Sequence, residues 1–185
     1  MKHEKKQVWI QEGYKLAAEI GLKTITIELI ARVLAKNKSS FYHYFGDFQF
    51  YETQLLTYHL HRSLDFAAEI QKCKKINPDL LTLALNYKHD IFFHKQLRLN
   101  REKQRYADCY KKAFRNYEEA VALKWGEFLN IPDNNTLLSR FLHFFTENLL
   151  LQATMENFNQ EWLEKYLDEL LLLVKQMDGA SDHGP

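Results

Sequence analysis

The sequence predicts an all-α fold, because apolar residues recur at helical spacing while residues that break helices are scarce. Only 6 Gly and 3 Pro occur among the 185 residues, of which 46% are hydrophobic and 14% aromatic. Successive stretches place apolar residues at i, i+3, i+4 and i+7, which is the period of one helix face. This length and apolar content are enough for one compact unit or for a small domain joined to a larger one. The successive helical stretches together predict about nine helices.

The first helix is expected over residues 4–20. Gly21 follows it as the C′ residue, where a positive φ commonly ends a helix. Gly13 lowers helix propensity, so its expected benefit is the close approach of a neighbouring helix. The face that packs inward is marked by residues at helical spacing: Trp9, Gly13, Leu16, Ala17 and Ile20.

Two short helices separated by a break come next. Thr26 is suited to cap the first, because its hydroxyl can accept an N–H of the first turn. The period is lost over three residues, and the last of them, Asn37, is a suitable cap for a helix beginning at Lys38. On that second helix Phe41 and Phe45 are four residues apart and point inward. The first short helix has one apolar face, formed by Ile27, Ile30, Ala31 and Leu34. The arrangement predicts a helix-turn-helix.

The outward face of the second short helix is polar. It carries Ser39, Ser40, Tyr42 and His43, with Lys38 at its edge. Lysine can bind a phosphate or a guanine edge, and serine can bind either a phosphate or a base. Tyrosine can bind the DNA backbone, and histidine can donate to an acceptor in the groove. The set suits a DNA duplex, although an ordinary solvated helix face has the same composition.

The run from Trp9 to Asp47 resembles, without a gap, the N-terminal domain of the tetracycline-repressor (TetR) family of bacterial transcription regulators. That pattern has Gly-aromatic or Gly-aliphatic after the first helix, a Thr-capped helix ending near Ile-Ala, a turn, and a short helix with Leu-Tyr-x-Tyr-Phe. The matching residues here are Gly21-Leu22, Thr26-Ile27, Ile30-Ala31 and Phe41-Tyr42-His43-Tyr44-Phe45. The resemblance covers about a quarter of the chain, and several spaced positions agree together.

The resemblance implies a recognition helix over residues 38–44. It implies that four side chains lie near bases, namely Lys38, Ser39, Ser40 and His43. It implies that three lie near phosphates, namely Thr26, Tyr42 and Tyr44.

Three positions depart from the family pattern. Ala35 stands where the turn usually has Gly, and Lys36 stands where a small apolar residue usually follows. Phe48 stands where a basic residue usually binds a phosphate. The loss of a phosphate contact is expected to weaken DNA binding and to flatten its dependence on salt.

Longer helices are expected after Asp47, which is suited to cap the first of them. Asn77 followed by Pro78 is a strong start signal, because Asn caps and Pro suits the first helical position. Residues 131–133, Ile-Pro-Asp, are a clear break. The approximate expected ranges are 48–74, 79–95, 105–129, 136–157 and 160–177, with a short helix or bend over 96–104 and a disordered tail over 179–185.

The last two of these helices are apolar on more than one face, and this surplus has to be buried within the chain or against a second copy. In the resembled family the last two helices form a four-helix dimer interface, so the resemblance implies a homodimer. The expected organisation is a helix-turn-helix DNA-binding domain over 1–47, a regulatory and dimerisation domain over 48–178, and the tail.

The charge distribution is mildly asymmetric. The net charge is +1, yet residues 1–50 contain eight Lys or Arg and five Asp or Glu. A local positive excess is the expected direction for a DNA-binding end. The first lysines, Lys2, Lys5 and Lys6, either reach phosphates or only favour solubility.

Cysteine usage and the absence of targeting signals indicate a cytoplasmic protein. Cys73 and Cys109 fit no zinc or redox spacing, so both are expected to be reduced. The N-terminal sequence MKHEKKQVWI lacks an apolar h-region. The apolar runs near the C-terminus are too short to span a bilayer.

A regulator of the resembled family would bind a small effector in its larger domain, and side chains on helices there could line the cavity. Core packing is the more common explanation for aromatic residues at helical spacing. No effector can be named. The candidate residues are Tyr87, Phe92, Phe93, His94, Tyr106, Cys109 and Tyr110.

The expected function is sequence-specific regulation of transcription, as a ligand-responsive repressor. The expected protein binds a palindromic DNA operator as a homodimer, without cofactor, metal or catalysis. A metal-dependent helical-bundle enzyme needs Glu-x-x-His pairs, and none of the 8 histidines has Glu three residues before it. No Gly-rich phosphate loop, zinc-protease motif or serine-elbow motif occurs either. A dimeric interaction protein with degenerate DNA binding stays open because of Lys36 and Phe48.

Overall fold

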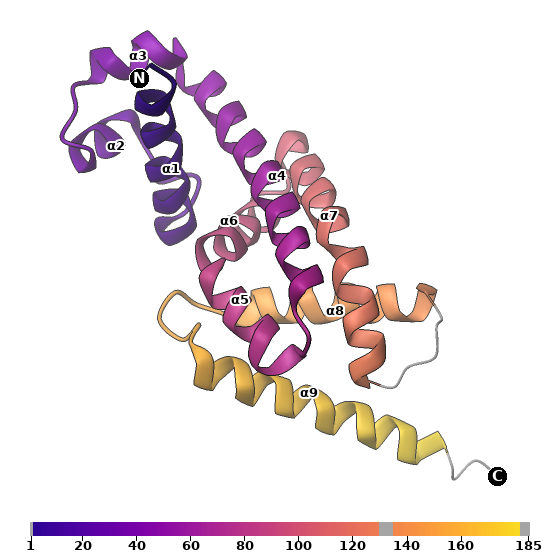
Figure 1. The fold of residues 1–185 in the computed structure, drawn as a ribbon. Coiled ribbons are helices and arrows are strands. Elements are labelled where there is room, and N and C mark those ends of the chain that lie inside the picture. The colour runs from indigo at the N-terminus through magenta and orange to yellow at the C-terminus, as the bar shows by residue number, and fades with distance from the viewer. Residues whose placement is uncertain (1, 130–134, 182–185) are drawn as a thin grey trace. The chain divides into compact units, whose positions relative to one another are not determined.

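The computed structural model describes residues 2–129 and 135–181, and within them it contains helices and no strand (Figure 1). The predicted all-α fold is therefore confirmed. The described chain forms ten helical elements, of which η1 is a single π-helical turn: α1 (Lys2–Ile20), α2 (Ile27–Val33), α3 (Lys38–Phe45), α4 (Phe48–Lys72), η1 (Ile76–Leu80), α5 (Leu81–Asn86), α6 (Lys88–Leu99), α7 (Gln104–Leu129), α8 (Asn135–Gln152) and α9 (Gln160–Ser181).

Three predicted helix caps are confirmed. The Leu29 N–H donates to Thr26 Oγ1 at 3.2 Å, which starts α2. The Ser40 N–H donates to Asn37 Oδ1 at 3.0 Å, which starts α3. The Phe50 N–H donates to Asp47 Oδ1 at 2.7 Å, which starts α4. Each bond satisfies a first-turn N–H that has no partner within its own helix.

The prediction of a single helix over residues 79–95 was wrong. The chain leaves helical geometry at Tyr87, where φ is −100° and ψ is 23°, so α5 and α6 are separate helices. Helix α6 also continues to Leu99, and the expected bend is confined to residues 100–103. The apolar period runs through Tyr87 without interruption, so the sequence pattern contains no sign of this break.

Asn77 has the backbone conformation expected of a helix cap, but the predicted capping bond from its side chain is not the one that forms. Asn77 is extended, with φ −108° and ψ 124°, as a capping residue would be. The acceptor at this start is instead the carboxylate of Asp79, whose Oδ2 lies 2.8 Å from the Lys74 nitrogen and 3.1 Å from that of Lys75. Asp79 therefore stabilises the turn by accepting from N–H groups that precede it in the chain.

The last two helices differ from their expected ends. Helix α8 ends at Gln152, and a turn follows in which the Thr154 N–H donates to Asn157 Oδ1 at 2.7 Å. Helix α9 continues through Ser181, so the tail expected from residue 179 was wrong for residues 179–181. The break expected at residues 131–133 lies outside the described residues.

The chain divides into two compact units. The first unit comprises Met1–Phe66 and Lys88–Tyr117, and the second comprises Ala67–Tyr87 and Glu118–Pro185. Helices α4 and α7 each contribute to both units. This is a division by packing, and the functional boundary expected between residues 47 and 48 stays a prediction.

Aromatic side chains form the core of the first unit where α1, α3 and α4 meet. Trp9, Phe41 and Tyr51 are all 0% exposed. The Trp9 and Phe41 rings meet edge to face at 5.5 Å, and the Tyr51 hydroxyl donates to the Trp9 carbonyl at 2.7 Å. A Cβ on Gly13 would lie 1.7 Å from the Tyr51 Oη, so the close helix approach expected at Gly13 is confirmed.

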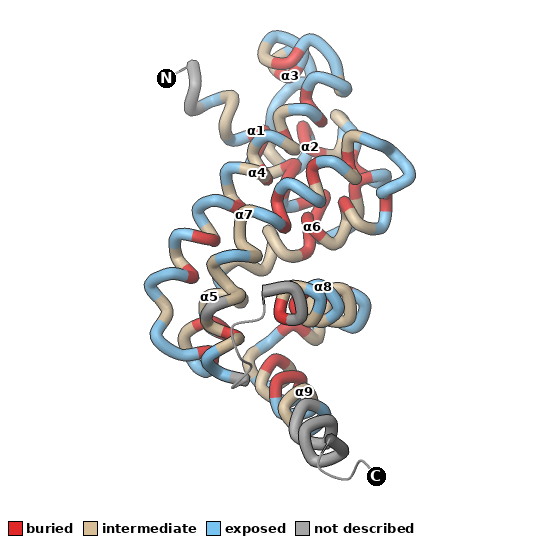
Figure 2. Tube along the Cα trace, turned by 90° about the vertical axis from the view of Figure 1, so that its right-hand side faces the viewer, coloured by how far each residue is buried: buried red, intermediate tan, exposed pale blue. Residues whose placement is uncertain are grey.

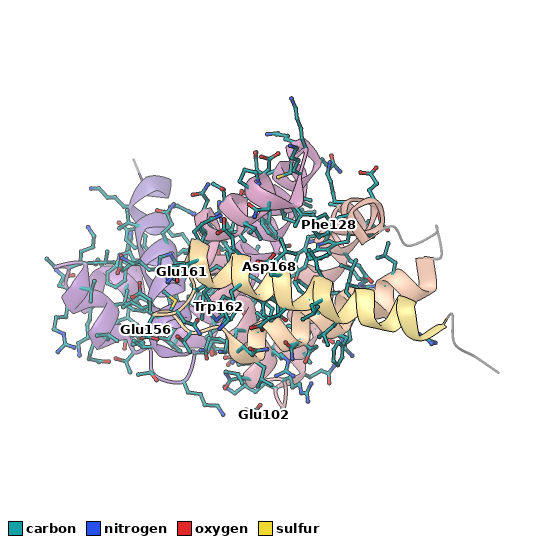
Figure 3. The ribbon with its side chains drawn as sticks, turned by 90° about the horizontal axis from the view of Figure 1, so that it is seen from below. Glu102, Phe128, Glu156, Glu161, Trp162 and Asp168 are labelled. Atoms are coloured by element: carbon teal, nitrogen blue, oxygen red, sulfur yellow. The ribbon has the colours of Figure 1, made fainter. Side chains whose placement is uncertain are left out.

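The second unit has its own aromatic core. The Trp125 and Phe145 ring centroids are 4.8 Å apart, and Tyr166 lies 5.3 Å from Phe145. The Tyr166 hydroxyl donates to Asn148 Oδ1 at 2.8 Å, which joins α9 to α8. Trp162 stacks on Tyr166 along α9, the helix that also carries Glu161 and Asp168 (Figure 3).

In the part of the chain that the structure describes, no helix combines the length and the apolar character that crossing a membrane requires.

Candidate nucleic-acid interface

Helices α2 and α3 are separated by a sharp turn, as the predicted helix-turn-helix requires. Ala35 has φ +50° in this turn, a left-handed conformation that L-residues adopt at a cost. The Lys36 N–H donates to the Ala31 carbonyl at 2.9 Å and closes the end of α2. Alanine therefore adopts here the left-handed conformation that Gly adopts more readily, at the position where the resembled family usually has Gly.

Helix α3 presents aromatic residues to the core and polar residues to solvent. Phe41 and Phe45 are 0% and 4% exposed, whereas Tyr42 is 50% exposed. Exposed residues alternate with half-buried and buried ones along α3 (Figure 2). Of the seven predicted DNA-binding residues, five are exposed and two are half-buried: Thr26, Lys38, Ser39, Tyr42 and His43 are exposed, and Ser40 and Tyr44 are half-buried.

The two serines of α3 also take part in the cap. Ser39 Oγ donates to Asn37 Oδ1 at 2.8 Å, and Ser40 Oγ donates to the Asn37 carbonyl at 2.8 Å. Thr26 is likewise a cap, because its hydroxyl oxygen accepts the Leu29 N–H. These hydroxyls hold the starts of α2 and α3 in shape, in addition to any contact with a ligand.

Lys38 pairs with an acidic residue that the sequence reasoning missed. Its Nζ lies 3.0 Å from Oε1 of Glu28, on the first turn of α2. The hydrogen bond to Lys38 lowers the pKa of the Glu28 carboxyl, and the same bond raises the pKa of the Lys38 ammonium. Both side chains are exposed, so the pair lies at the surface where the two helices begin.

Lys6 is held against aromatic rings close to the end of α3. Its Nζ donates to Gln54 Oε1 at 3.0 Å and lies 5.4 Å from the ring centroids of both Phe45 and Phe50. The contact between an ammonium and a ring face is favourable. Lys6 therefore has a packing role beyond the solubility or phosphate contact expected from its position.

An open pocket lies beside the start of α4. The buried carboxylate of Glu52 accepts hydrogen bonds from Arg105 and from the Tyr106 hydroxyl. Lys103 and Arg105 bring positive charge next to Phe48, where the resembled family usually has a basic residue. The pocket is lined by Phe48, Gln49, Glu52, Lys103, Gln104 and Arg105.

Most of the predicted effector-binding side chains pack within the first unit. Phe92, Phe93, His94, Tyr106 and Cys109 are buried, Tyr110 is half-buried, and Tyr87 belongs to the second unit. His94 stacks on Tyr110 with centroids 4.2 Å apart, and Phe93 stacks on Tyr14 at the same distance. Core packing accounts for these contacts, and the effector role stays a prediction.

A buried chain of hydrogen bonds joins four helices around His94. Arg62 binds Asp90 through two bonds of 2.8 and 2.9 Å, and the Tyr14 hydroxyl donates to Asp90 at 3.0 Å. The Tyr14 oxygen lies 2.7 Å from His59 Nδ1, and His59 Nε2 lies 3.2 Å from His94 Nδ1. The other His94 nitrogen, Nε2, lies 3.0 Å from the Tyr117 hydroxyl.

The direction of every proton in this chain follows from Asp90. The Tyr14 hydroxyl has one proton and gives it to Asp90, so its oxygen must accept from His59 Nδ1–H. His59 Nε2 is then an acceptor for His94 Nδ1–H, and the Tyr117 hydroxyl donates to His94 Nε2. Burial lowers the pKa of both histidines and so keeps both rings neutral, and each neutral ring is therefore protonated at Nδ1.

Burial opposes a charge on either histidine. It lowers the pKa of His59 to about 4, and it holds the pKa of His94 well below the usual value for histidine. Burial raises the pKa of the Tyr14 hydroxyl, and the adjacent Asp90 raises it further. Sequence reasoning named only His94 of this chain, because the partners come from helices distant in sequence.

Among residues 2–129 and 135–181, no group of three or more His, Cys, Asp or Glu is placed to hold a metal ion. Comparisons of the chain with protein-family models, with curated proteins and with solved structures found no match.

Proposed function

We propose that the chain is a sequence-specific DNA-binding regulator of transcription that acts as a homodimer. The observation that carries the proposal is the two-sided character of α3, in which Phe41 and Phe45 face the core and Tyr42 and His43 face solvent. Helix-turn-helix proteins insert such a second helix into the major groove while the first crosses the backbone. The resemblance of residues 9–47 to the TetR family supports the same function.

The exposed residues divide by chemistry into two groups. Lys38 and His43 can donate to acceptors on base edges, and Tyr42 can donate to a phosphate. Lysines on α1 and Lys103 add positive charge in the first unit, which favours a polyanion, whereas the charge of Arg105 is neutralised by Glu52. This local charge supports DNA binding in a chain whose net charge is only +1.

Large apolar side chains on the surface of the second unit support the homodimer. Phe144 and Leu151 on α8 are 71% and 69% exposed, and Leu172 and Leu173 on α9 are 57% and 59% exposed. Exposed apolar residues that gather on adjacent helices favour association. A second copy supplies the same helices, so each α8 and α9 pair would be covered by its twin.

A double substitution tests the interface between copies. Replacing both Phe144 and Leu173 by Asp should convert the dimer to a monomer in analytical ultracentrifugation, because each buried carboxylate would lack a partner. The matched control replaces Leu64 by Asp, since Leu64 on α4 is 53% exposed and belongs to the first unit. A wild-type chain that sediments as a monomer at micromolar concentration would contradict the homodimer.

A dimer would bind two half-sites in successive major grooves, about 34–36 Å apart or a multiple of that distance. Selection from random duplexes at a stated ionic strength should return a near-palindromic site, and a gel shift then measures its affinity. Replacing Tyr42 and His43 together by Ala should abolish the shift while the chain remains dimeric. The control is His61→Ala, an exposed histidine on α4. A double variant that shifts the site as well as wild type would overturn the assignment of the recognition helix.

The effector remains part of the proposal. The buried chain from Arg62 to Tyr117 joins α1, which packs against α3 through Trp9 and Phe41, to α4, α6 and α7. A small molecule that displaced His94 or Tyr110 would disturb α1 through this chain. Screening ligands for a shift in melting temperature, with His94→Gln as the comparison variant, tests whether these residues take part in binding.

A dimeric interaction protein without DNA binding is the second candidate. The Lys38–Glu28 pair favours it, because the carboxylate neutralises the first cation of α3 and would repel phosphates. Phe48 at the start of α4 favours it too. Such a protein would show no salt-dependent affinity for any duplex, whereas a regulator would show both salt dependence and a preferred site.

A further inference from the structure

The Lys38–Glu28 pair joins the first residue of α3 to the first turn of α2. Its Nζ and Oε1 are 3.0 Å apart, and the two side chains are 54% and 64% exposed. A carboxylate at this position is unexpected for a surface that would approach phosphates, because it repels them. The pair therefore needs an explanation beyond general attraction to DNA.

The position of the pair points to bases rather than to the backbone. In helix-turn-helix proteins, residues at the N-terminal end of the recognition helix contact base edges. Lys38 begins α3, and Glu28 is held beside it by the ion pair. Both groups therefore lie at the end of α3 that would enter the groove.

The chemistry of the pair matches one base pair. In the major groove guanine presents two adjacent acceptors, O6 and N7, and its partner cytosine presents an amino donor. The guanine O6 and the cytosine amino nitrogen are themselves hydrogen-bonded, so they are separated by about 2.9 Å. This spacing is close to the 3.0 Å between Lys38 Nζ and Glu28 Oε1.

We infer that Glu28 and Lys38 act together to read a single G·C base pair in each half-site. Lys38 donates to guanine O6 and N7, and Glu28 accepts from the cytosine amino group. An A·T pair also places an acceptor, thymine O4, beside an amino donor, but the thymine methyl lies where guanine has its second adjacent acceptor, and adenine N7 lies on the other side of the amino group. The inference rests on the proposed function and names Glu28 as a specificity-determining residue.

The same arrangement limits binding to the wrong sequence. On a duplex without the correct pair, Glu28 still neutralises Lys38 and adds a negative charge near the phosphates. Removing the carboxylate should therefore raise the affinity for random duplex DNA and make its salt dependence steeper. Specificity here comes partly from repulsion of incorrect sites.

Site selection with the full-length chain tests the inference. Wild type should select one fixed G·C pair per half-site, and changing it to A·T should weaken binding roughly 5- to 150-fold. Glu28→Gln and Lys38→Gln should each relax the preference at that same base pair, and Glu28→Gln should also bind random duplex more tightly. The matched control is Glu69→Gln, which removes the carboxylate of another exposed pair, Lys72 with Glu69, where Nζ and Oε1 are 2.6 Å apart.

The outcomes separate two failures. If wild type selects a site but the two variants relax different base pairs or none, or if the shared pair is A·T, the inference is wrong and the proposed function stands. If wild type binds no duplex in a salt-dependent manner, the proposed function fails and the inference fails with it. Circular dichroism of each variant verifies that the exposed substitutions leave the helices intact.

Discussion

His59 Nε2 and His94 Nδ1 lie 3.2 Å apart inside the first unit, and one must donate while the other accepts. The chain of bonds that begins at Asp90 decides which, because it leaves His59 Nε2 without a proton. A second proton on His59 would place its Nε2–H against the Nδ1–H of His94, unless His94 moved its own proton to Nε2 and donated to Tyr117 instead. This pair is therefore stable only while both rings are neutral.

Stability should decline in mild acid because of this pair. The pKa of His59 is lowered to about 4 in the folded chain, whereas unfolded histidine has a pKa of about 6.5. As pH falls, the unfolded chain therefore binds protons before the folded chain does. The contribution of His59 to the free energy of unfolding is complete above about pH 6.5, declines as pH falls toward about 4, and does not change further below that pH. The loss should be on the order of 1–3 kcal/mol.

Urea unfolding at a series of pH values between 7 and 4 measures this loss. Carboxylates also titrate toward the acid end, so the comparison is with His59→Gln, whose stability should vary less over the same interval. His61→Gln changes an exposed histidine and should keep the wild-type profile. Parallel profiles for wild type and His59→Gln would contradict the prediction.

Replacing Tyr14 by Phe should destabilise the first unit. The hydroxyl donates to Asp90 and accepts from His59, so its removal leaves the buried His59 Nδ1–H without an acceptor. A buried unsatisfied donor costs about 1–3 kcal/mol. Tyr42→Phe removes a hydroxyl from a side chain that is 50% exposed, and it should change the unfolding free energy by less than about 0.5 kcal/mol. Equal losses in the two variants would refute a stabilising role for the buried chain.

Replacing Ala35 by Gly should stabilise the helix-turn-helix. Ala35 has φ +50°, and an L-residue in this region carries about 1–2 kcal/mol of strain that Gly would relieve. Part of this gain is lost because Gly has more conformational freedom in the unfolded chain. The expected gain is about 0.5–1 kcal/mol, seen as a higher melting temperature. Ala68→Gly, at an exposed site within α4, should instead lose about 1 kcal/mol. A loss at both positions would show that the turn is unstrained.

Replacing Gly13 by Ala should destabilise the contact between α1 and α4. The new Cβ would lie 1.7 Å from Tyr51 Oη and 2.8 Å from Cζ, so the helices must separate, at about 1–3 kcal/mol. The same change should cost less in a Tyr51→Phe background, where the nearer atom is gone. A double-mutant cycle measured by urea unfolding gives the coupling, and a coupling of zero would contradict the contact.

The features that sequence could predict are local ones. The caps at Thr26, Asn37 and Asp47 depend on bonds that span three residues, so residue type and spacing suffice to find them. The inward position of Phe41 and Phe45 follows from helical period in the same way. These signals located the ends of α2 and α3 and the exposed face of α3.

The features that sequence could not predict join distant residues. Tyr14 and Asp90 are 76 positions apart, and Glu28 and Lys38 are 10 apart across a turn, so no period or motif connects them. The break at Tyr87 was missed for another reason, because apolar spacing continues through it while the backbone does not. Long-range pairing and backbone breaks of this kind are set by tertiary packing, which overrides local preference.

The missing side chain at Gly13 has a mechanical consequence. It lets α4 lie directly on α1, where the Tyr51 hydroxyl donates a hydrogen bond to the Trp9 carbonyl. Only two residues separate α4 from α3. Under the proposed function, α3 then has no hinge of its own. A rotation of α4 would then rotate the recognition helix through the same angle. The distance between the two recognition helices of a dimer would therefore depend on the tilt of α4.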